Sequence, residues 1–186
     1  MKRKPLCGID EAGRGPLAGS LVMAGVVLTE EIDGLMDSKK LTEKKREALF
    51  PLVLEKSQHH IVTFSAQQID EMGISKCLQA GLKAIQKALP GCHYLFDGNS
   101  TFGVENIETM VKADDKVAEV SAASILAKVT RDREMIEMAK RYPAYGFEKH
   151  KGYGTKAHIE ALVIHGRCSV HRKTFRVKGL DEPTLF

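Results

Sequence analysis

Acidic side chains stand at three points of the chain where an apolar segment ends or a helix begins. The pair Asp10-Glu11 ends one apolar strand, Asp97 ends another, and the pair Asp114-Asp115 precedes a long helical segment. Clustered carboxylates repel one another and raise each other's pKa unless cations neutralise them. Oxygen ligands without His or Cys select Mg²⁺ or Mn²⁺. If the three points converge, four carboxylates balance two divalent cations, an arrangement suited to phosphoryl transfer.

Each acidic position also has an ordinary structural explanation. Asp at a helix start is favoured by the helix dipole, which accounts for Asp114 and Asp115 without any metal. Acids are also common in turns and on the surface, which accounts for Asp10, Glu11 and Asp97 one at a time. The metal-site interpretation gains its force from three such positions in one chain.

The segment Gly13-Arg14-Gly15 directly follows the first acidic pair. Adjacent side chains on a strand point to opposite faces, so we expect the strand to end at Asp10 and the turn to redirect Glu11. The glycines also let a ligand approach the backbone closely. Position 18 is not glycine, so the segment lacks the dinucleotide-binding pattern.

Positive charge is concentrated near the C-terminus. Residues 141–178 hold nine Lys or Arg against two acids, a balance of 9 − 2 = +7, which leaves 4 − 7 = −3 for the remaining chain. Such a basic region suits a polyanion, nucleic acid first, although a solvated basic surface explains the charge equally well. His158 and His165 are seven residues apart, and we expect an exposed or phosphate-facing pair because no third metal ligand stands nearby.

The composition excludes several classes of protein. The 186 residues fit one domain, residues 1–186, with 43% hydrophobic and 28% charged residues. The longest apolar stretch, Leu21–Leu28, is too short for a membrane span, and no signal-peptide core follows the basic start. The four cysteines form no C-x-x-C pair, which argues against a zinc ribbon or disulfide framework and indicates a reducing cytoplasm.

Hydrophobic periodicity and turn residues predict an α/β fold, a mixed sheet with helices packed on it. The first two strands are expected to form a hairpin-like pair, and the small residues 121–127 to let the longest helix lie close to the sheet. The expected strands are Leu6–Asp10, Leu21–Leu28, His60–Ala66, His93–Phe96 and Ile107–Val111. The expected helices are Thr42–Lys56, Ile74–Leu89, Lys116–Arg141 and Thr155–His165.

Five ordered sequence blocks carry a resemblance to a known family. They are Asp10–Pro16, Asp37–Leu41, Asp97–Asn99, Ser121–Asp132 and Lys151–Thr155. Together, over about Cys7–Val177, they resemble bacterial ribonuclease HII. The resemblance implies an RNase H-like fold with a C-terminal helical extension. It also implies a metal-dependent endonuclease that cleaves the RNA of RNA–DNA hybrids, and DNA at single embedded ribonucleotides.

The resemblance also implies roles for individual residues. Its four metal-binding catalytic acids correspond to Asp10, Glu11, Asp97 and Asp114. The family usually has Lys-Gly-Asp where this chain has Lys-Ala-Asp-Asp, so Asp115 is the alternative fourth ligand. The residues implied in substrate binding are Gly13, Arg14, Gly15, Lys39, Lys40 and Tyr153, of which the glycine turn and Tyr153 would sense the ribonucleotide.

We therefore expect a cytoplasmic, monomeric endoribonuclease that uses two Mg²⁺ or Mn²⁺ ions and leaves 3′-hydroxyl and 5′-phosphate ends. Phosphate contacts are expected from Lys149, Lys151, Arg172 and Lys173. One alternative is ribonuclease HIII, which adds an N-terminal domain, whereas nine residues precede Asp10 here. Another is a non-catalytic hybrid-binding module.

The C-terminal residues 182–186 also allow two interpretations. A short apolar tail after a charged stretch can dock on a sliding clamp, but a frayed terminus is the simpler explanation.

Overall fold

A computed structural model describes residues 3–36 and 41–181 of the chain. The strands form one five-stranded sheet in the order β3-β2-β1-β4-β5. Strands β1, β2 and β3 pair antiparallel, whereas β4 and β5 continue from β1 in parallel. Their bounds are β1 Leu6–Ala12, β2 Leu21–Leu28, β3 Ser57–Phe64, β4 His93–Asp97 and β5 Ile107–Met110. The predicted mixed α/β fold, including the antiparallel first pair, is confirmed.

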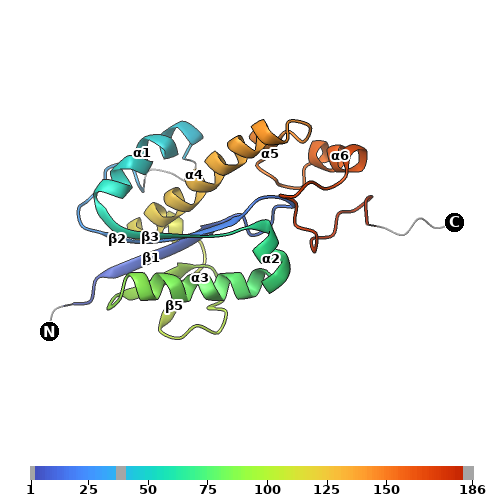
Figure 1. Ribbon diagram of the computed structural model, residues 1–186. Helices are drawn as coiled ribbons and strands as arrows, with labels where there is room; N and C mark the ends of the chain where they lie inside the picture. Colours follow the sequence, from blue (N-terminus) through green and yellow to red (C-terminus); the bar gives the residue numbers. More distant parts are fainter. Residues whose placement is uncertain (1–2, 37–40, 182–186) are drawn as a thin grey trace.

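Helices cover both faces of this sheet (Figure 1). Helices α1 and α4 lie over one face, and α2 and α3 lie over the other, while α5 and α6 extend beyond one end of the sheet. The helices are α1 Glu43–Glu55, α2 Ala66–Met72, α3 Ile74–Ala88, α4 Ala118–Arg141, α5 Phe147–His150 and α6 Lys156–His165, with a 3-10 turn η1 at Ala113–Asp115. No helix among the described residues is both long enough and apolar enough to span a membrane.

The two faces of β2 explain why the sheet can be covered on both sides. Leu21 and Met23 are buried in the hydrophobic core beneath α3, whereas Val22 and Ala24 are buried in the core beneath α1 and α4. Successive side chains on a strand point to opposite faces, so a continuous apolar strand supplies both cores.

Helix α4 lies unusually close to β1, as its small residues predict. A Cβ atom added to Gly8 would come within 2.3 Å of the backbone of Glu119 and Val120. Ala122, Ala123 and Ala127 are fully buried on the same helix. Only small residues permit this approach, which brings the N-terminal end of α4 close to the central strand.

The structure differs from the predicted elements at two strand ends and in two additional short helices. Strand β1 continues to Ala12 and does not stop at Asp10, and β3 ends at Phe64, whereas we expected a strand to Ala66. Ser65 instead begins helix α2, because its side chain and that of Gln68 form a reciprocal capping box. Helices α2 and α5 were not predicted, since each is too short to show a clear period.

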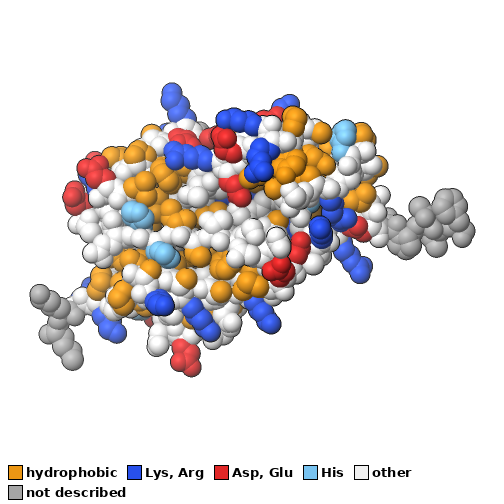
Figure 2. Space-filling model, viewed as in Figure 1, with side chains coloured by type: hydrophobic (Ala, Val, Ile, Leu, Met, Phe, Trp, Pro, Cys, Tyr) orange, Lys and Arg blue, Asp and Glu red, His pale blue; other side chains and the backbone are white. Residues whose placement is uncertain are grey.

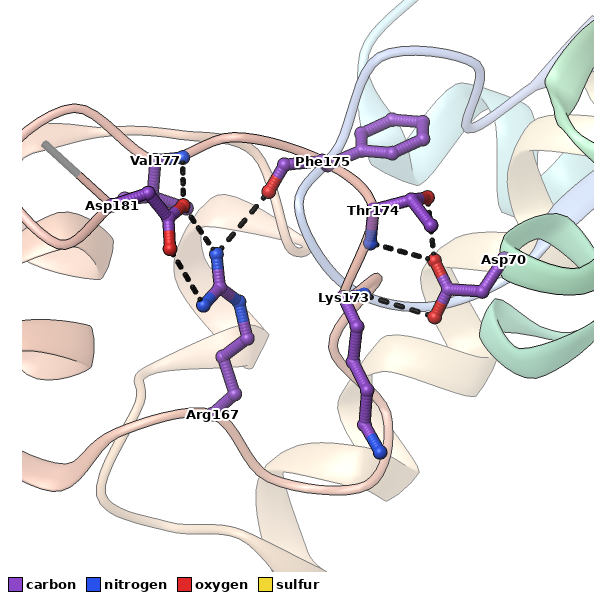
Figure 3. A network of polar contacts seen from close by, with 7 residues as sticks. All are labelled: Asp70, Arg167, Lys173, Thr174, Phe175, Val177 and Asp181. Carbon is purple, nitrogen blue, oxygen red and sulfur yellow. Dashed lines mark hydrogen bonds and ion pairs between the residues drawn. The ribbon is translucent and has the colours of Figure 1, made fainter.

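The chain after α6 has no helix among its described residues, and polar contacts fix its path (Figure 3). Asp70 of α2 accepts hydrogen bonds from the backbone N–H groups of Lys173 and Thr174, at 2.9 and 3.0 Å. Arg167 pairs with Asp181 at 2.5 Å. The predicted C-terminal helical part is therefore α5 and α6, followed by an irregular segment fastened to the body of the domain.

Candidate active site

Three of the four predicted acids lie together at one edge of the sheet. The parallel register pairs Ile9 with Phe96, so Asp10 and Asp97 come next to each other on β1 and β4. Both side chains point to the α4 face, the face of Gly8 and Leu95. Asp114 reaches them from η1, and its backbone N–H donates to Asp97 Oδ2 at 3.1 Å. One carboxylate oxygen from each of the three acids lies within 4.8 Å of the others.

The surroundings of these acids disfavour their charged forms. Burial raises the pKa of Asp10 well above its usual range, and the neighbouring charges of Glu11 and Asp97 raise it further. Burial, together with Asp97, raises the pKa of Asp114 to about 6. Such repulsion between buried carboxylates is relieved by a cation, and carboxylate oxygens are ligands that Mg²⁺ and Mn²⁺ accept. The side chains present therefore fit a divalent metal.

Glu11 lies beside Asp10 but outside the group of three carboxylates. Strand β1 continues past Glu11, so the expected end of the strand at Asp10 is wrong, but the carboxylate of Glu11 still lies close enough to Asp10 for its charge to raise the pKa of Asp10. Glu11 Oε1 accepts from Arg14 at 2.5 Å. Its Oε2 is buried without a hydrogen-bond partner among the described residues. An unpartnered buried carboxylate oxygen is costly, so this atom is available to a ligand.

The structure favours Asp114 over its neighbour Asp115 as the fourth predicted acid. Asp114 is half-buried and belongs to the group of three carboxylates, whereas Asp115 is exposed and does not belong to it. Lys112 adopts a left-handed conformation, φ 56°, ahead of η1 and so turns the chain toward Asp97.

Two buried arginines bind the backbone of residues 13–20, the segment that contains the glycine turn. Arg172 donates to the carbonyl oxygens of Gly13 and Arg14, at 2.5 and 3.1 Å. Arg131 donates to the carbonyl oxygens of Ala18 and Ser20, both at 2.8 Å. A Cβ atom on Gly13, where φ is 91°, would lie 2.2 Å from Arg131 Nε, so glycine is required there.

Neither arginine was predicted from the sequence to bind this segment. Arg131 belongs to the block Ser121–Asp132, where a long cation among small residues was the available signal. Arg172 had been expected to contact substrate phosphate, and this is wrong because its side chain is 1% exposed and bound to carbonyl oxygens.

Tyr153 is connected to the glycine turn through the same contacts. Its ring lies with its centroid 5.6 Å from Arg131 Cζ. Arg131 also donates to the carbonyl oxygen of Lys151 at 2.7 Å, and the Leu17 N–H donates to Gly152 at 2.8 Å. Tyr153 itself is 44% exposed, so the ring is accessible to a ligand.

Other predicted contact residues are placed as follows. Arg14 and Gly15 are exposed beside Glu11, whereas Lys39 and Lys40 lie outside the described residues. Lys149 and Lys173 are exposed, and the side chain of Lys173 points away from Asp70 (Figure 3). On the face in Figure 2, Lys and Arg side chains are dispersed among Asp and Glu. His158 is fully buried, so the expected exposed or phosphate-facing pair with His165 is wrong.

Comparison with known proteins decides the family. The family described as Ribonuclease HII matches residues 7–178. The chain belongs to the ribonuclease HII family. A ribonuclease HII of Sulfurovum sp. (strain NBC37-1) is 78% identical over 98% of this chain and 97% of that protein. The ribonuclease HII of Aliarcobacter butzleri is 58% identical over 96% and 94%. The chain is thus a ribonuclease H, an endonuclease, and the non-catalytic alternative is excluded.

Solved structures of ribonucleases H have the same fold. The chain from the PCNA:RNase HII complex of Archaeoglobus fulgidus superposes with a TM-score of 0.80 at 27% identity, covering 94% of this chain and 96% of that one. Ribonuclease H2 of Pyrococcus horikoshii OT3 gives a TM-score of 0.71 at 27% identity over 91% and 93%. Bst-RNase HIII shares the fold at 18% identity, and this chain covers 63% of it. The family match favours ribonuclease HII over the HIII alternative.

Proposed function

We propose that this ribonuclease HII-family enzyme cleaves the RNA strand of RNA–DNA hybrids and cuts duplex DNA 5′ of a single embedded ribonucleotide. The products would carry 3′-hydroxyl and 5′-phosphate ends. The observation that carries the proposal is the meeting of Asp10, Asp97 and Asp114 within 4.8 Å beside the glycine turn. We further propose that residues 1–186 act as one domain, as a monomer in the cytoplasm.

In this proposal, Asp10, Glu11, Asp97 and Asp114 are the catalytic acids and hold two Mg²⁺ or Mn²⁺ ions. Bound there, the ions would supply positive charge to the attacking and leaving oxygens of the scissile phosphate. The chain's own contribution is to hold its carboxylates ready: the Asp114 N–H fixes Asp97, and Arg14 fixes Glu11. A structure of Bst-RNase HIII in complex with Mn²⁺ has the same fold. Cleavage rates with Mg²⁺ and with Mn²⁺ measure which of the two metals the enzyme prefers.

Ribonucleotide recognition is assigned to the backbone of Gly13, Arg14 and Gly15 and to Tyr153. The 2′-hydroxyl is what distinguishes one ribose within a DNA duplex, and it both donates and accepts hydrogen bonds. Arg14 and Gly15 are exposed, so a ligand can approach the backbone of the turn closely there. Lys39 and Lys40 are proposed to contact the substrate backbone.

A sliding clamp is proposed as a protein partner. The Archaeoglobus fulgidus chain, 27% identical to this one, was solved in a complex with PCNA. The tail expected to dock, residues 182–186, lies outside the described residues. Binding of the clamp by the full chain, but not by a chain shortened at Asp181, would support this partner; equal binding by both would contradict the tail's role.

The deciding experiment uses an end-labelled DNA duplex with one internal ribonucleotide. With Mg²⁺ or Mn²⁺, we expect one cut on the 5′ side of the ribonucleotide, and with EDTA none. An all-DNA duplex of the same sequence is the control for specificity, and a continuous RNA–DNA hybrid tests the second substrate. Cleavage of the all-DNA duplex, or equal cleavage in EDTA, would contradict the proposal.

A further inference from the structure

Three histidines of the C-terminal part surround the turn that carries Tyr153, and the catalytic proposal uses none of them. His158 is fully buried, and His171 is 2% exposed. His150 stacks on His158 with ring centroids 4.3 Å apart. Their hydrogen bonds join the irregular C-terminal segment to Tyr153.

The hydrogen bonds of His171 fix the position of its proton. The backbone N–H of Cys168 donates to His171 Nδ1 at 2.9 Å, so this nitrogen carries no proton. The proton of the neutral ring is therefore on Nε2. That nitrogen lies 2.9 Å from His158 Nε2, to which it donates.

The tautomer of His158 is then determined by that of His171. Its Nε2 accepts from His171, so its own proton is on Nδ1. His158 Nδ1 lies 2.8 Å from the carbonyl oxygen of Tyr153 and donates to it. All four ring nitrogens of His158 and His171 thus take part in one chain of hydrogen bonds. Along it, each group donates to the next, from the Cys168 N–H to the Tyr153 carbonyl oxygen. This leaves them no free nitrogen for a metal.

The turn stabilised by these hydrogen bonds has an unfavourable backbone conformation. Lys151 and Gly152 both have positive φ, 53° and 88°. Left-handed backbone at a residue other than glycine costs energy and persists only when the surroundings fix it. His150 adds a second constraint, because its Nδ1 accepts the Gly152 N–H at 3.1 Å while its Nε2 bonds to the Tyr145 carbonyl at 2.6 Å.

We propose that His158 and His171 are positioning residues for Tyr153: as two neutral rings they relay a hydrogen bond to the Tyr153 carbonyl and so fix the turn that presents the tyrosine ring to the ribonucleotide. The proposal rests on the sensing role proposed for Tyr153 above. Burial lowers the pKa of His158 and lowers that of His171 to about 4, which agrees with neutral rings.

Two substitutions at one position separate this role from simple packing. The amide of His158→Gln reaches the Nε2 position and keeps a partner for His171, but loses the donor to Tyr153. The shorter amide of His158→Asn keeps a donor near the Nδ1 position and loses the bond to His171. His165→Gln and His165→Asn, on the exposed end of the same helix, are the matched controls.

The measured quantity is the ratio of cleavage rates on the single-ribonucleotide duplex and on the continuous hybrid. We expect His158→Gln to lower this ratio about two- to tenfold, the effect of one hydrogen bond to a neutral partner, and His158→Asn to lower it less. In a Tyr153→Ala background the His158→Gln effect should disappear, since the two changes act on one contact. Equal ratios for Gln and Asn, or an effect that persists without the tyrosine ring, would overturn the proposal.

Tautomers measured by nitrogen-15 NMR of wild-type histidines give a test that needs no variant and no substrate. We expect the proton of His171 on Nε2 and that of His158 on Nδ1; the opposite tautomers would overturn the relay. A wild-type enzyme that cleaves neither substrate would instead contradict the proposed function, so the two failures are distinguishable.

Discussion

Arg172 donates to the carbonyl oxygen of Gly13 at 2.5 Å, across a separation of 159 residues. Burial lowers the pKa of Arg172 to about 10, and the nearby charge of Arg131 contributes. The hydrogen bonds that this buried guanidinium makes within the described residues all go to carbonyl oxygens, which accept its N–H groups and stabilise it. The glycine turn beside the acidic cluster is therefore fixed by the irregular segment that follows α6.

Replacing Arg172 by Lys should destabilise the protein although it keeps the charge. A single ammonium group cannot reach the three carbonyl oxygens of Gly13, Arg14 and Gly19 that the guanidinium contacts. Hydrogen bonds from charged groups contribute about 1.5–3 kcal/mol each, so we expect a loss of about 3 kcal/mol in the free energy of unfolding, measured with urea. The exposed Arg176→Lys is the control, and equal stability of both variants would refute the role of Arg172.

Replacing Asp97 by Asn should abolish most cleavage and leave the fold intact. The change keeps the shape of the side chain and removes one ligand charge, so the rate should fall by orders of magnitude at saturating Mg²⁺. Without metal, the variant should be as stable as wild type or more so, because carboxylate repulsion is relieved. Near-normal cleavage would remove Asp97 from the catalytic acids.

The same assay compares Asp114→Asn with Asp115→Asn, a matched pair of neighbours. We expect a large loss only for Asp114→Asn, since Asp114 alone of the two lies with Asp10 and Asp97.

Much of this site could be predicted from the sequence, for identifiable reasons. The acids at strand ends were visible as charges after apolar runs, but the contact of Asp10 with Asp97 depends on the parallel pairing of β1 with β4, a long-range relationship. The end of β1 was predicted two residues too early, because the strand continues through the acidic pair to Ala12.

The burial of polar side chains was the second feature that could not be predicted from the sequence. Arg172 was predicted to be a surface cation because arginine is almost never fully buried. Its acceptors are backbone carbonyl oxygens of a distant turn, and no residue type marks these in the sequence. His158 was misjudged for the same reason, because its partners are a backbone carbonyl and His171.

Metal-free stability should depend on pH through Asp114. Its pKa is raised from 3.8 in the unfolded chain to about 6 in the folded one, so the folded state binds the proton more tightly. This contribution is fully present below about pH 4 and is lost as the pH rises through 6. His171, whose pKa is lowered to about 4, acts in the opposite direction, so stability must be compared between variants.

We therefore expect the difference in free energy of unfolding, wild type minus Asp114→Asn, to favour wild type increasingly as the pH falls from 7 to 4 in EDTA. Asp115→Asn is the control. Urea denaturation at several pH values measures it, and a difference that stays constant would contradict the raised pKa.

Exposed lysines of the C-terminal part should contribute to binding in a sequence-independent way. Lys173→Ala should weaken the binding of all duplex sequences similarly and reduce the slope of log affinity against log salt by roughly one. Lys83→Ala, on α3, is a matched control. An unchanged slope for both Lys149→Ala and Lys173→Ala would mean that the basic region is a solvated surface.

Tyr153 should matter more for a single ribonucleotide than for a continuous hybrid. A hybrid offers many ribonucleotides at which the enzyme can cut, whereas an embedded one must be found by its only 2′-hydroxyl. Tyr153→Ala removes the exposed ring, so it should lose most cleavage at the single site while metal binding and the fold persist. Tyr153→Phe keeps the ring and loses one hydroxyl, which should cost about 0.5–1.5 kcal/mol, a few-fold to tenfold in rate.

The ratio of rates on the two substrates, for wild type and both Tyr153 variants, separates the ring from its hydroxyl. If stacking of the ring dominates, the ratio for Tyr153→Phe will stay close to that of wild type and only Tyr153→Ala will reduce it strongly. If the hydroxyl contacts the ribose, both variants will reduce it. An Ala variant as fast as wild type on both substrates would show that Tyr153 only packs against Arg131, whose guanidinium lies 5.6 Å from the ring centroid.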